Sequence, residues 1–241
     1  MKNQIITEDY AIYLNDCMEV VSKMPDKSIH LSVYSPPFAG LYNYSSSERD
    51  FSNCETKEQF LDQYDFLVKE ISRVTKPGRI SAVHVTDVHD NTGKLWDFPG
   101  EVIKIHEKYG MQYHNRITVW KEPLKVRMRT MVQSLMHKFI VEDATKCFPA
   151  MPDYVLIFKK TGENETPVVH PSGLNDFEYF GETPFLEAHV KTYGNYKDFK
   201  NKWKGFSGNP AENKLSHLTW QRYASSVWDD VRIDNVLPFK D

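Results

Sequence analysis

The stretch Ile-His-Leu-Ser-Val-Tyr at residues 29–34 runs directly into Ser35-Pro36-Pro37-Phe38. Its β-branched and aromatic residues predict a buried strand, and the two prolines predict a rigid turn at its end. Each proline fixes φ near about −65° and has no amide hydrogen, and the residue before a proline is held extended. The carbonyls of such a turn can accept hydrogen bonds from a ligand, and Phe38 can offer that ligand a flat face. The pattern therefore indicates an exposed binding turn at the end of a buried strand.

Strands and helices are expected to alternate along the first two thirds of the chain. Further strands are predicted at 10–14, 80–85, 113–120 and 154–159, with helices beginning at Asp16, Thr56 and Asp97. Asp16 with Glu19 three residues later is typical of a capping box. The apolar stripe expected to be buried along that first helix is Cys17, Val20, Val21 and Met24. Helices packed on the faces of a sheet, an α/β fold, follow from this alternation.

Composition restricts the classes of protein that the chain can belong to. Its 241 residues are 40% hydrophobic and 26% charged, which is ordinary for a globular domain with a sizeable core. No apolar run approaches the ~18 residues of a membrane span, and no signal peptide follows Met1. Three cysteines, Cys17, Cys54 and Cys147, cannot pair completely and share no metal-like spacing, so a reduced, cytoplasmic setting is expected. The net charge of −3 still allows a locally positive nucleic-acid cleft.

The turn and its surroundings resemble the amino-methylating DNA methyltransferases, the enzymes that act on cytosine N4 or adenine N6. Their signature is Asp, Asn or Ser followed by Pro-Pro and an aromatic residue, matched here by Ser35 to Phe38. The matching segments, in the family's order, are 15–21, 25–31, 70–79, 117–123 and 153–160. His30 departs from the pattern, since an Asp is common there. The resemblance implies a Rossmann-like, S-adenosylmethionine-dependent methyltransferase fold in the permuted order that begins with the Ser-Pro-Pro-Phe motif.

The resemblance also implies roles for the residues of the turn. The Ser35 hydroxyl and the Pro36 carbonyl would accept the two hydrogens of the target amine, on a turn made rigid by Pro37. Phe38 would stack on the base, which has to be flipped out of double-stranded DNA to reach the turn. The alternative from the residues alone is that Ser-Pro-Pro-Phe merely ends a strand. Ser in the first position leans toward cytosine N4.

The same resemblance assigns S-adenosylmethionine to the neighbouring segment. Asp16 would accept a hydrogen bond from the adenine amino group of that cofactor, with Cys17 and Tyr34 beside it. The alternative is that Asp16 is only a helix N-cap, and both roles can hold at once.

Lys121, Lys125, Arg127 and Arg129 form the densest positive segment, in which cations alternate as on a strand edge or an extended loop. Their functional interpretation is contact with DNA phosphates, and the alternative is a solvated face.

A second polar cluster, His84, Asp87, His89 and Asp90, fits no standard set of metal ligands. Strand-end residues are the expected interpretation, and no metal site is predicted.

Residues 1–160 are expected to form the catalytic portion, and residues 161–241 a target-recognition region followed by a return toward the cofactor-binding half. In that C-terminal region Gly, Asn, Pro and aromatic residues lack clear periodicity. The glycine-rich turn by which the family binds the methionine end of its cofactor is missing, so the sheet is expected to be incomplete.

Three hypotheses about function follow. The first is a site-specific DNA methyltransferase, as in restriction–modification, completed by a second chain or a missing C-terminal segment that supplies the glycine-rich turn. The second is a DNA-binding relative that cannot methylate, or half of a split enzyme. The third is a methyltransferase that acts on RNA.

Overall fold

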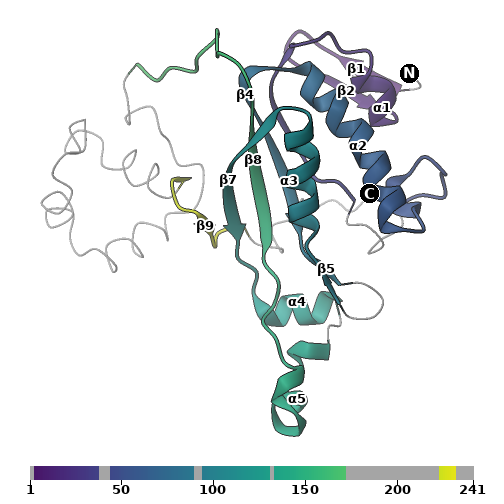
Figure 1. Cartoon of the computed structure of the whole chain (residues 1–241), viewed down its shortest axis with the longest axis vertical. Coiled ribbons are helices and arrows are strands. Elements are labelled where there is room, and N and C mark those ends of the chain that lie inside the picture. The colour runs from purple at the N-terminus through teal and green to yellow at the C-terminus, as the bar shows by residue number, and fades with distance from the viewer. Residues whose placement is uncertain (1–2, 38–43, 90–93, 131–132, 172–222, 232–241) are drawn as a thin grey trace, which may run out of the picture. The chain divides into compact units, whose positions relative to one another are not determined.

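A five-stranded mixed sheet forms the centre of the fold (Figure 1). The computed structural model describes residues 3–37, 44–89, 94–130, 133–171 and 223–231. The sheet order is β3 (Ile29–Tyr34), β4 (Thr75–Thr86), β8 (Asp153–Lys160), β7 (Met111–Val119) and β9 (Val227–Trp228). Strand β8 runs antiparallel to β4 and β7, whereas β3 is parallel to β4 and β9 is parallel to β7. The sheet therefore brings the ends of β3, β4 and β7 and the beginning of β8 to one edge.

The chain divides into two units, residues 1–165 with 227–241 and residues 166–226. The sheet and all the helices named below belong to the first unit. Of the second unit, residues 166–171 and 223–226 are described. The predicted target-recognition region falls largely on residues 172–222, outside the described residues.

Helices α2 (Lys57–Val74) and α3 (Phe98–Lys108) pack together against the sheet (Figure 1). Thr56 caps α2 by accepting a hydrogen bond from the amide of Gln59 at 3.1 Å, and Asp97 caps α3 by accepting one from Gly100 at 2.8 Å. The side chains buried between the helices and the sheet include Phe60, Tyr64, Val68, Phe98, Val102, Leu156 and Phe158. Leu67 and Ile71, which follow Phe60 and Tyr64 along α2 at steps of three and four residues, belong to the same core face.

Strand β3 has the predicted bounds, but the expectation that it is buried was wrong. Leu31 is 59% exposed and Val33 is 72% exposed, because β3 is an edge strand of the described sheet and these side chains face away from the helices. Tyr34, on the opposite face, reaches the helices. Apolar residues on a half-covered edge strand carry the same sequence pattern as a fully buried one, so the sequence could not distinguish the two.

Strand β4 begins five residues earlier than predicted. Its pairing with β3 shifts from Ile29–Thr75 to Leu31–Ile80, so residues 76–79 form an irregularity within the strand. Gly78 in this segment has φ +70°, and a Cβ there would lie 2.6 Å from the side chain of Asn164. Lys76-Pro77-Gly78 therefore follows the end of α2 directly and lies inside the next strand.

The first helix is less buried than predicted and lacks the predicted capping box. Helix α1 (Cys17–Val21) follows the hairpin of β1 (Asn3–Ile6) and β2 (Ala11–Leu14) and has no buried residue. Of the stripe predicted to be buried, Cys17 is exposed and Val20, Val21 and Met24 are half-buried. Asp16 caps it by accepting a hydrogen bond from the amide of Met18 at 2.8 Å. The capping box was wrong, because the Glu19 carboxylate pairs with Arg49 at 2.6 Å instead.

Smaller elements lie beyond the edge at which β7 ends and β8 begins (Figure 1). They are α4 (Pro123–Thr130) and α5 (His137–Glu142), together with the short hairpin of β5 (Val88–His89) and β6 (Leu95–Trp96). Among the described helices, none is both long and apolar enough to cross a membrane.

Candidate active site

Residues from four neighbouring strands meet at one edge of the sheet. Ser35 follows the last residue of β3, and His84 lies near the end of β4. Asp153 is the first residue of β8, and Lys121 comes two residues after the end of β7. The edge at which parallel strands end is where ligands bind in open α/β sheets. The topology thus places four polar side chains where a reaction site is expected.

A pocket of about 770 Å³ opens beside this edge. Its walls include the predicted residues Asp16, Cys17, Tyr34, Ser35, Pro36 and Pro37. Leu67 and Ile71 of α2 and residues of the segment 45–51 also line it. Two segments that the sequence linked only by resemblance, the one at Asp16 and the turn at Ser35, therefore share one cavity. Phe38 lies outside the described residues.

The turn presents hydrogen-bond acceptors to the pocket. Ser35 is exposed, while Pro36 is buried and holds the backbone beneath it. The Ser35 Oγ lies 3.4 Å from the Pro36 carbonyl oxygen. Since neither proline has an amide hydrogen, the turn offers a hydroxyl and carbonyls and no backbone donor at these two positions.

Asp16 is held by contacts at both ends of its carboxylate. One oxygen accepts the capping hydrogen bond from Met18, and the other lies 3.0 Å from the Arg49 guanidinium. Arg49 also pairs with Glu19, and that hydrogen bond lowers the pKa of the Glu19 carboxyl. The cap and the ion pair fix Asp16 at the pocket wall.

The other two residues predicted to adjoin the cofactor differ in character. Desolvation and then the Asp16 charge raise the pKa of the Cys17 thiol, so it stays protonated at neutral pH. The Tyr34 hydroxyl points into the core, 3.1 Å from the Tyr64 hydroxyl and 3.0 Å from Nε2 of His106. Burial raises the pKa of Tyr34. Tyr34 therefore anchors β3 to the helices and also lines the pocket.

A connected row of polar groups runs behind Ser35. The Ser35 Oγ lies 3.3 Å from Nδ1 of His84 and 3.1 Å from the His84 carbonyl oxygen. Nε2 of His84 lies 3.1 Å from Oδ2 of Asp153, and the Lys121 ammonium contacts Oδ1 of the same carboxylate. Hydrogen bonding from His84 and the charge of Lys121 outweigh burial and lower the pKa of Asp153. Reasoning from the sequence treated His84 as an ordinary strand-end residue and did not single out Asp153.

The family model described as DNA methylase, of N6 and N4 methyltransferases, matches residues 29–236. The chain belongs to this DNA methylase family. The match includes the Ser35 turn, His84, Lys121 and Asp153, and it confirms the family predicted from the Ser-Pro-Pro-Phe motif. A search of curated proteins finds no match for the chain.

Solved structures share the fold of this DNA methylase. A candidate DNA modification methylase from Thermus thermophilus, solved with S-adenosyl-L-methionine, is 18% identical over 92% of this chain and 67% of its own, with a TM-score of 0.53. Its selenomethionine derivative is 19% identical over 90% and 65%, with a TM-score of 0.51. The likeness confirms the α/β, Rossmann-like fold. The chain spans about two thirds of the length of these structures.

The cations of this DNA methylase were predicted to alternate along a strand edge or an extended loop. The structure differs from that prediction. Lys121 precedes α4 and is occupied with Asp153, whereas residues 123–130 are helical. A helix places Lys125 and Arg127, two residues apart, on different faces. The alternation was misleading because every second residue in a helix points about 200° around its axis. The side chain of Arg129 lies outside the described residues.

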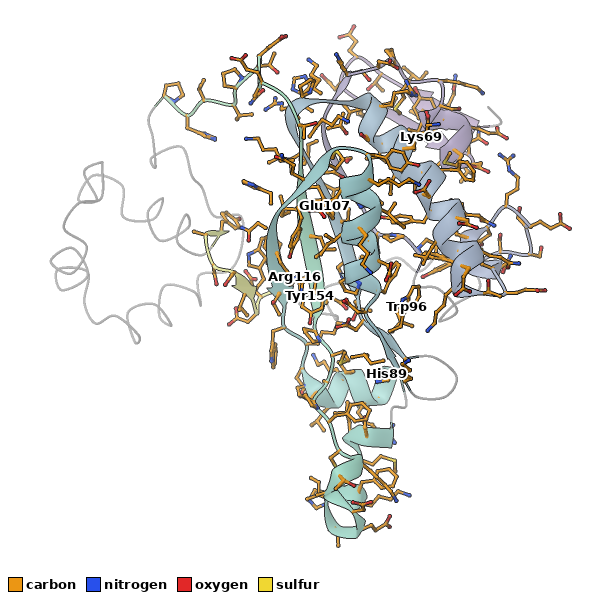
Figure 2. The ribbon with its side chains drawn as sticks, viewed as in Figure 1. Lys69, His89, Trp96, Glu107, Arg116 and Tyr154 are labelled. Carbon is orange, nitrogen blue, oxygen red and sulfur yellow. The ribbon has the colours of Figure 1, made fainter. Side chains whose placement is uncertain are left out.

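In the second polar cluster, His89 contacts an aromatic ring and Asp87 interacts with charged side chains. His89, which is labelled in Figure 2, stacks on Phe148 with ring centroids 5.4 Å apart. Burial, and then the charge of Asp97, raise the pKa of Asp87. Asp90 lies outside the described residues. No group of three or more metal-ligating side chains occurs among the residues the structure describes.

Proposed function

We propose that this DNA methylase transfers a methyl group from S-adenosylmethionine to the exocyclic amine of a base flipped out of double-stranded DNA, with cytosine N4 favoured over adenine N6. The observation that carries the proposal is the single pocket that joins Asp16 to the Ser35-Pro36-Pro37 turn. In the family pattern one of these segments adjoins the cofactor and the other holds the amine.

The turn suits an amine target because its two prolines offer carbonyl acceptors and no amide donor, and the Ser35 hydroxyl oxygen can accept as well. An exocyclic amine is a poor nucleophile while its lone pair is delocalised into the ring. The Ser35 hydroxyl oxygen and the Pro36 carbonyl can each accept one amine hydrogen, which turns the lone pair out of the ring plane. When bound, the cofactor supplies an electrophilic methyl group. The stacking role of Phe38 remains a prediction.

The residues present fit one end of the cofactor. Asp16, fixed by its cap and by Arg49, can accept a hydrogen bond from the adenine amino group. The methionine end needs donors for its carboxylate, and the sequence has no D-P-F-x-G-x-G turn. We infer that further residues of the same protein, or a second chain, supply that turn. Within the described sheet β3 is an edge strand, with Leu31 exposed and Val33 exposed in the pocket wall, which supports this inference.

A DNA-binding relative that cannot methylate is the second candidate, favoured by the missing glycine-rich turn. The two candidates differ in what they require of Ser35. A methyltransferase needs its hydroxyl, whereas a binding protein does not. Ser35→Ala should therefore abolish methyl transfer and leave DNA affinity unchanged if the first candidate is right. Cellular function that survives Ser35→Ala would favour the second.

The test is transfer of labelled methyl groups. The full chain is incubated with labelled S-adenosylmethionine and mixed-sequence DNA or RNA, and the product is digested to nucleosides. We expect label on N4-methylcytosine, lost in Ser35→Ala and kept in the control Ser22→Ala, whose hydroxyl only contacts the Glu19 carbonyl. Label on adenine or in RNA would correct the substrate. A folded chain that transfers none would have to be retested with its completing segment.

A further inference from the structure

Ser35, His84, Asp153 and Lys121 form a row of contacts. Which atom donates and which accepts along this row follows from the chemistry of its groups. The Asp153 carboxylate is acceptor-only when ionised, so Nε2 of His84, 3.1 Å away, must carry a hydrogen and donate it. Lys121 holds the other carboxylate oxygen, so Asp153 stays ionised and cannot turn away. A neutral imidazole that donates from Nε2 has a lone pair on Nδ1. That lone pair faces the Ser35 Oγ at 3.3 Å.

The same order of groups, hydroxyl to imidazole to carboxylate, activates serine nucleophiles in hydrolases. Here the neighbouring backbone argues against that use. In such hydrolases, backbone amides near the nucleophile commonly donate to the tetrahedral oxyanion. The two residues after Ser35 are prolines and have no amide hydrogen. A turn whose prolines offer carbonyls and no amide hydrogen suits a partner that carries hydrogens, such as an amine.

His84 can act on Ser35 in two ways: it can accept the hydrogen of the hydroxyl, and it can keep a proton. To accept a hydrogen from the target amine, the Ser35 oxygen must direct its own hydrogen elsewhere. The His84 Nδ1 and carbonyl oxygen, at 3.3 and 3.1 Å, both lie behind the hydroxyl and can receive it. Of these two, only Nδ1 can also keep a proton.

We propose, on the basis of the proposed function, that His84 is the proton acceptor behind Ser35 and that Asp153 and Lys121 hold it in the tautomer that this requires. As the amine nitrogen forms its bond to the methyl group, the electron pair of the breaking bond stays on sulfur and the nitrogen becomes cationic. The nitrogen then gives one proton to Ser35 Oγ, and Ser35 gives its own proton to Nδ1 of His84. The resulting imidazolium faces the Asp153 carboxylate. His84, with a side chain 38% exposed, releases the proton to water.

The tautomer is tested without catalysis, by two-bond ¹H–¹⁵N spectra of the ¹⁵N-labelled full chain, with His84→Gln used to assign the resonance. We expect a protonated Nε2 and an unprotonated Nδ1. In Asp153→Asn, Lys121 should attract the amide oxygen and leave the amide NH₂ toward His84, which moves the hydrogen to Nδ1. A wild-type His84 protonated at Nδ1, or a tautomer that Asp153→Asn leaves unchanged, would overturn the arrangement.

The role in transfer is tested with methylation kinetics on chains whose folding is checked by circular dichroism. We expect His84→Gln and Asp153→Asn each to lower kcat by about 100-fold with KM for DNA little changed. His114→Gln, an exposed histidine on β7, should leave kcat unchanged. A kcat within twofold of wild type in a folded His84→Gln chain would refute the proton-acceptor role. If wild type transfers no label even when retested with its completing segment, the proposed function fails, and the spectra alone still decide the arrangement of the row.

Discussion

Nη1 of Arg73, in the last turn of α2, donates a hydrogen bond to the carbonyl oxygen of Met24 at 2.8 Å. The same guanidinium reaches Asp26 at 2.5 Å, Glu70 at 2.7 Å and the Val21 carbonyl at 3.0 Å. It therefore ties the end of α2 to the segment that leads into β3. Two motifs that the sequence linked only by resemblance to one family, around residues 25–31 and 70–79, are physically connected by this one side chain.

Arg73 should accordingly be more important for stability than other cations on the helix. Arg73→Ala removes the donors of every one of these hydrogen bonds, and Arg73→Lys keeps the charge but cannot reproduce the planar fork. We expect both variants to lower the midpoint of thermal unfolding by several degrees, with Arg73→Ala the lower. Lys69→Ala, an exposed position on the same helix (Figure 2), is the control. An Arg73→Lys variant as stable as wild type would show that charge alone is needed.

The two roles of Asp16 can be separated by choice of substituent. Asp16→Ser keeps a side-chain oxygen for the N-cap and loses the carboxylate, whereas Asp16→Ala loses both. We expect Asp16→Ser to retain stability and to weaken binding of S-adenosylmethionine, measured by calorimetry. Asp16→Ala should weaken binding equally and cost about 1 kcal/mol of unfolding free energy as well. If Asp16→Ser binds the cofactor as wild type does, Asp16 is a helix cap only.

The sequence predicted the elements whose signals are local. The strand at 29–34, the periodicity of α2 and the Pro-Pro turn could all be read from neighbouring residues. The exposure of Leu31 and Val33 could not, because it depends on which strand lies beside β3.

The candidate site likewise combines residues that local motifs predicted with contacts that depend on how the strands pair. Asp16 and Ser35 were predicted from motifs, and both line the pocket. The contact between His84 and Asp153 arises because β4 and β8 pair antiparallel, which no local pattern specifies. Lys121 was expected to contact phosphate because it begins a cationic run, and the fold gives it Asp153 instead.

His106 makes the stability of the fold depend on pH. Its Nδ1 donates to the Val102 carbonyl at 2.7 Å, so Nε2 accepts from the Tyr34 hydroxyl, and the ring stacks on Phe158. Burial lowers its pKa from 6.5 to about 4. Between these values the unfolded chain binds the extra proton, so this stability is complete above pH 6.5 and is lost as pH falls toward 4.

The free energy of unfolding should fall by about 3 kcal/mol at most because of His106, as measured by urea unfolding from pH 7 to 4. His106→Gln should be less stable at pH 7 and lose less stability on acidification than wild type. The control His114→Gln should keep the wild-type slope, because that side chain is exposed. If the free energy of unfolding changes with pH equally in wild type and His106→Gln, His106 takes up its proton in the folded state as readily as in the unfolded chain.

The cations of α4 should affect DNA binding differently from Lys121. If Lys125 and Arg127 contact phosphates, each Ala variant should weaken binding to all DNA sequences alike and reduce the slope of log K against log salt by about one. Lys121, held on Asp153 behind the turn, should change methyl transfer more than the salt slope when replaced by Ala. Fluorescence anisotropy with mixed-sequence duplexes at several salt concentrations measures the slopes, with Lys69→Ala as the matched control. A Lys121→Ala slope reduced as much as that of Lys125→Ala would place Lys121 on DNA, because a cation confined to the Asp153 ion pair releases no counterions from the duplex.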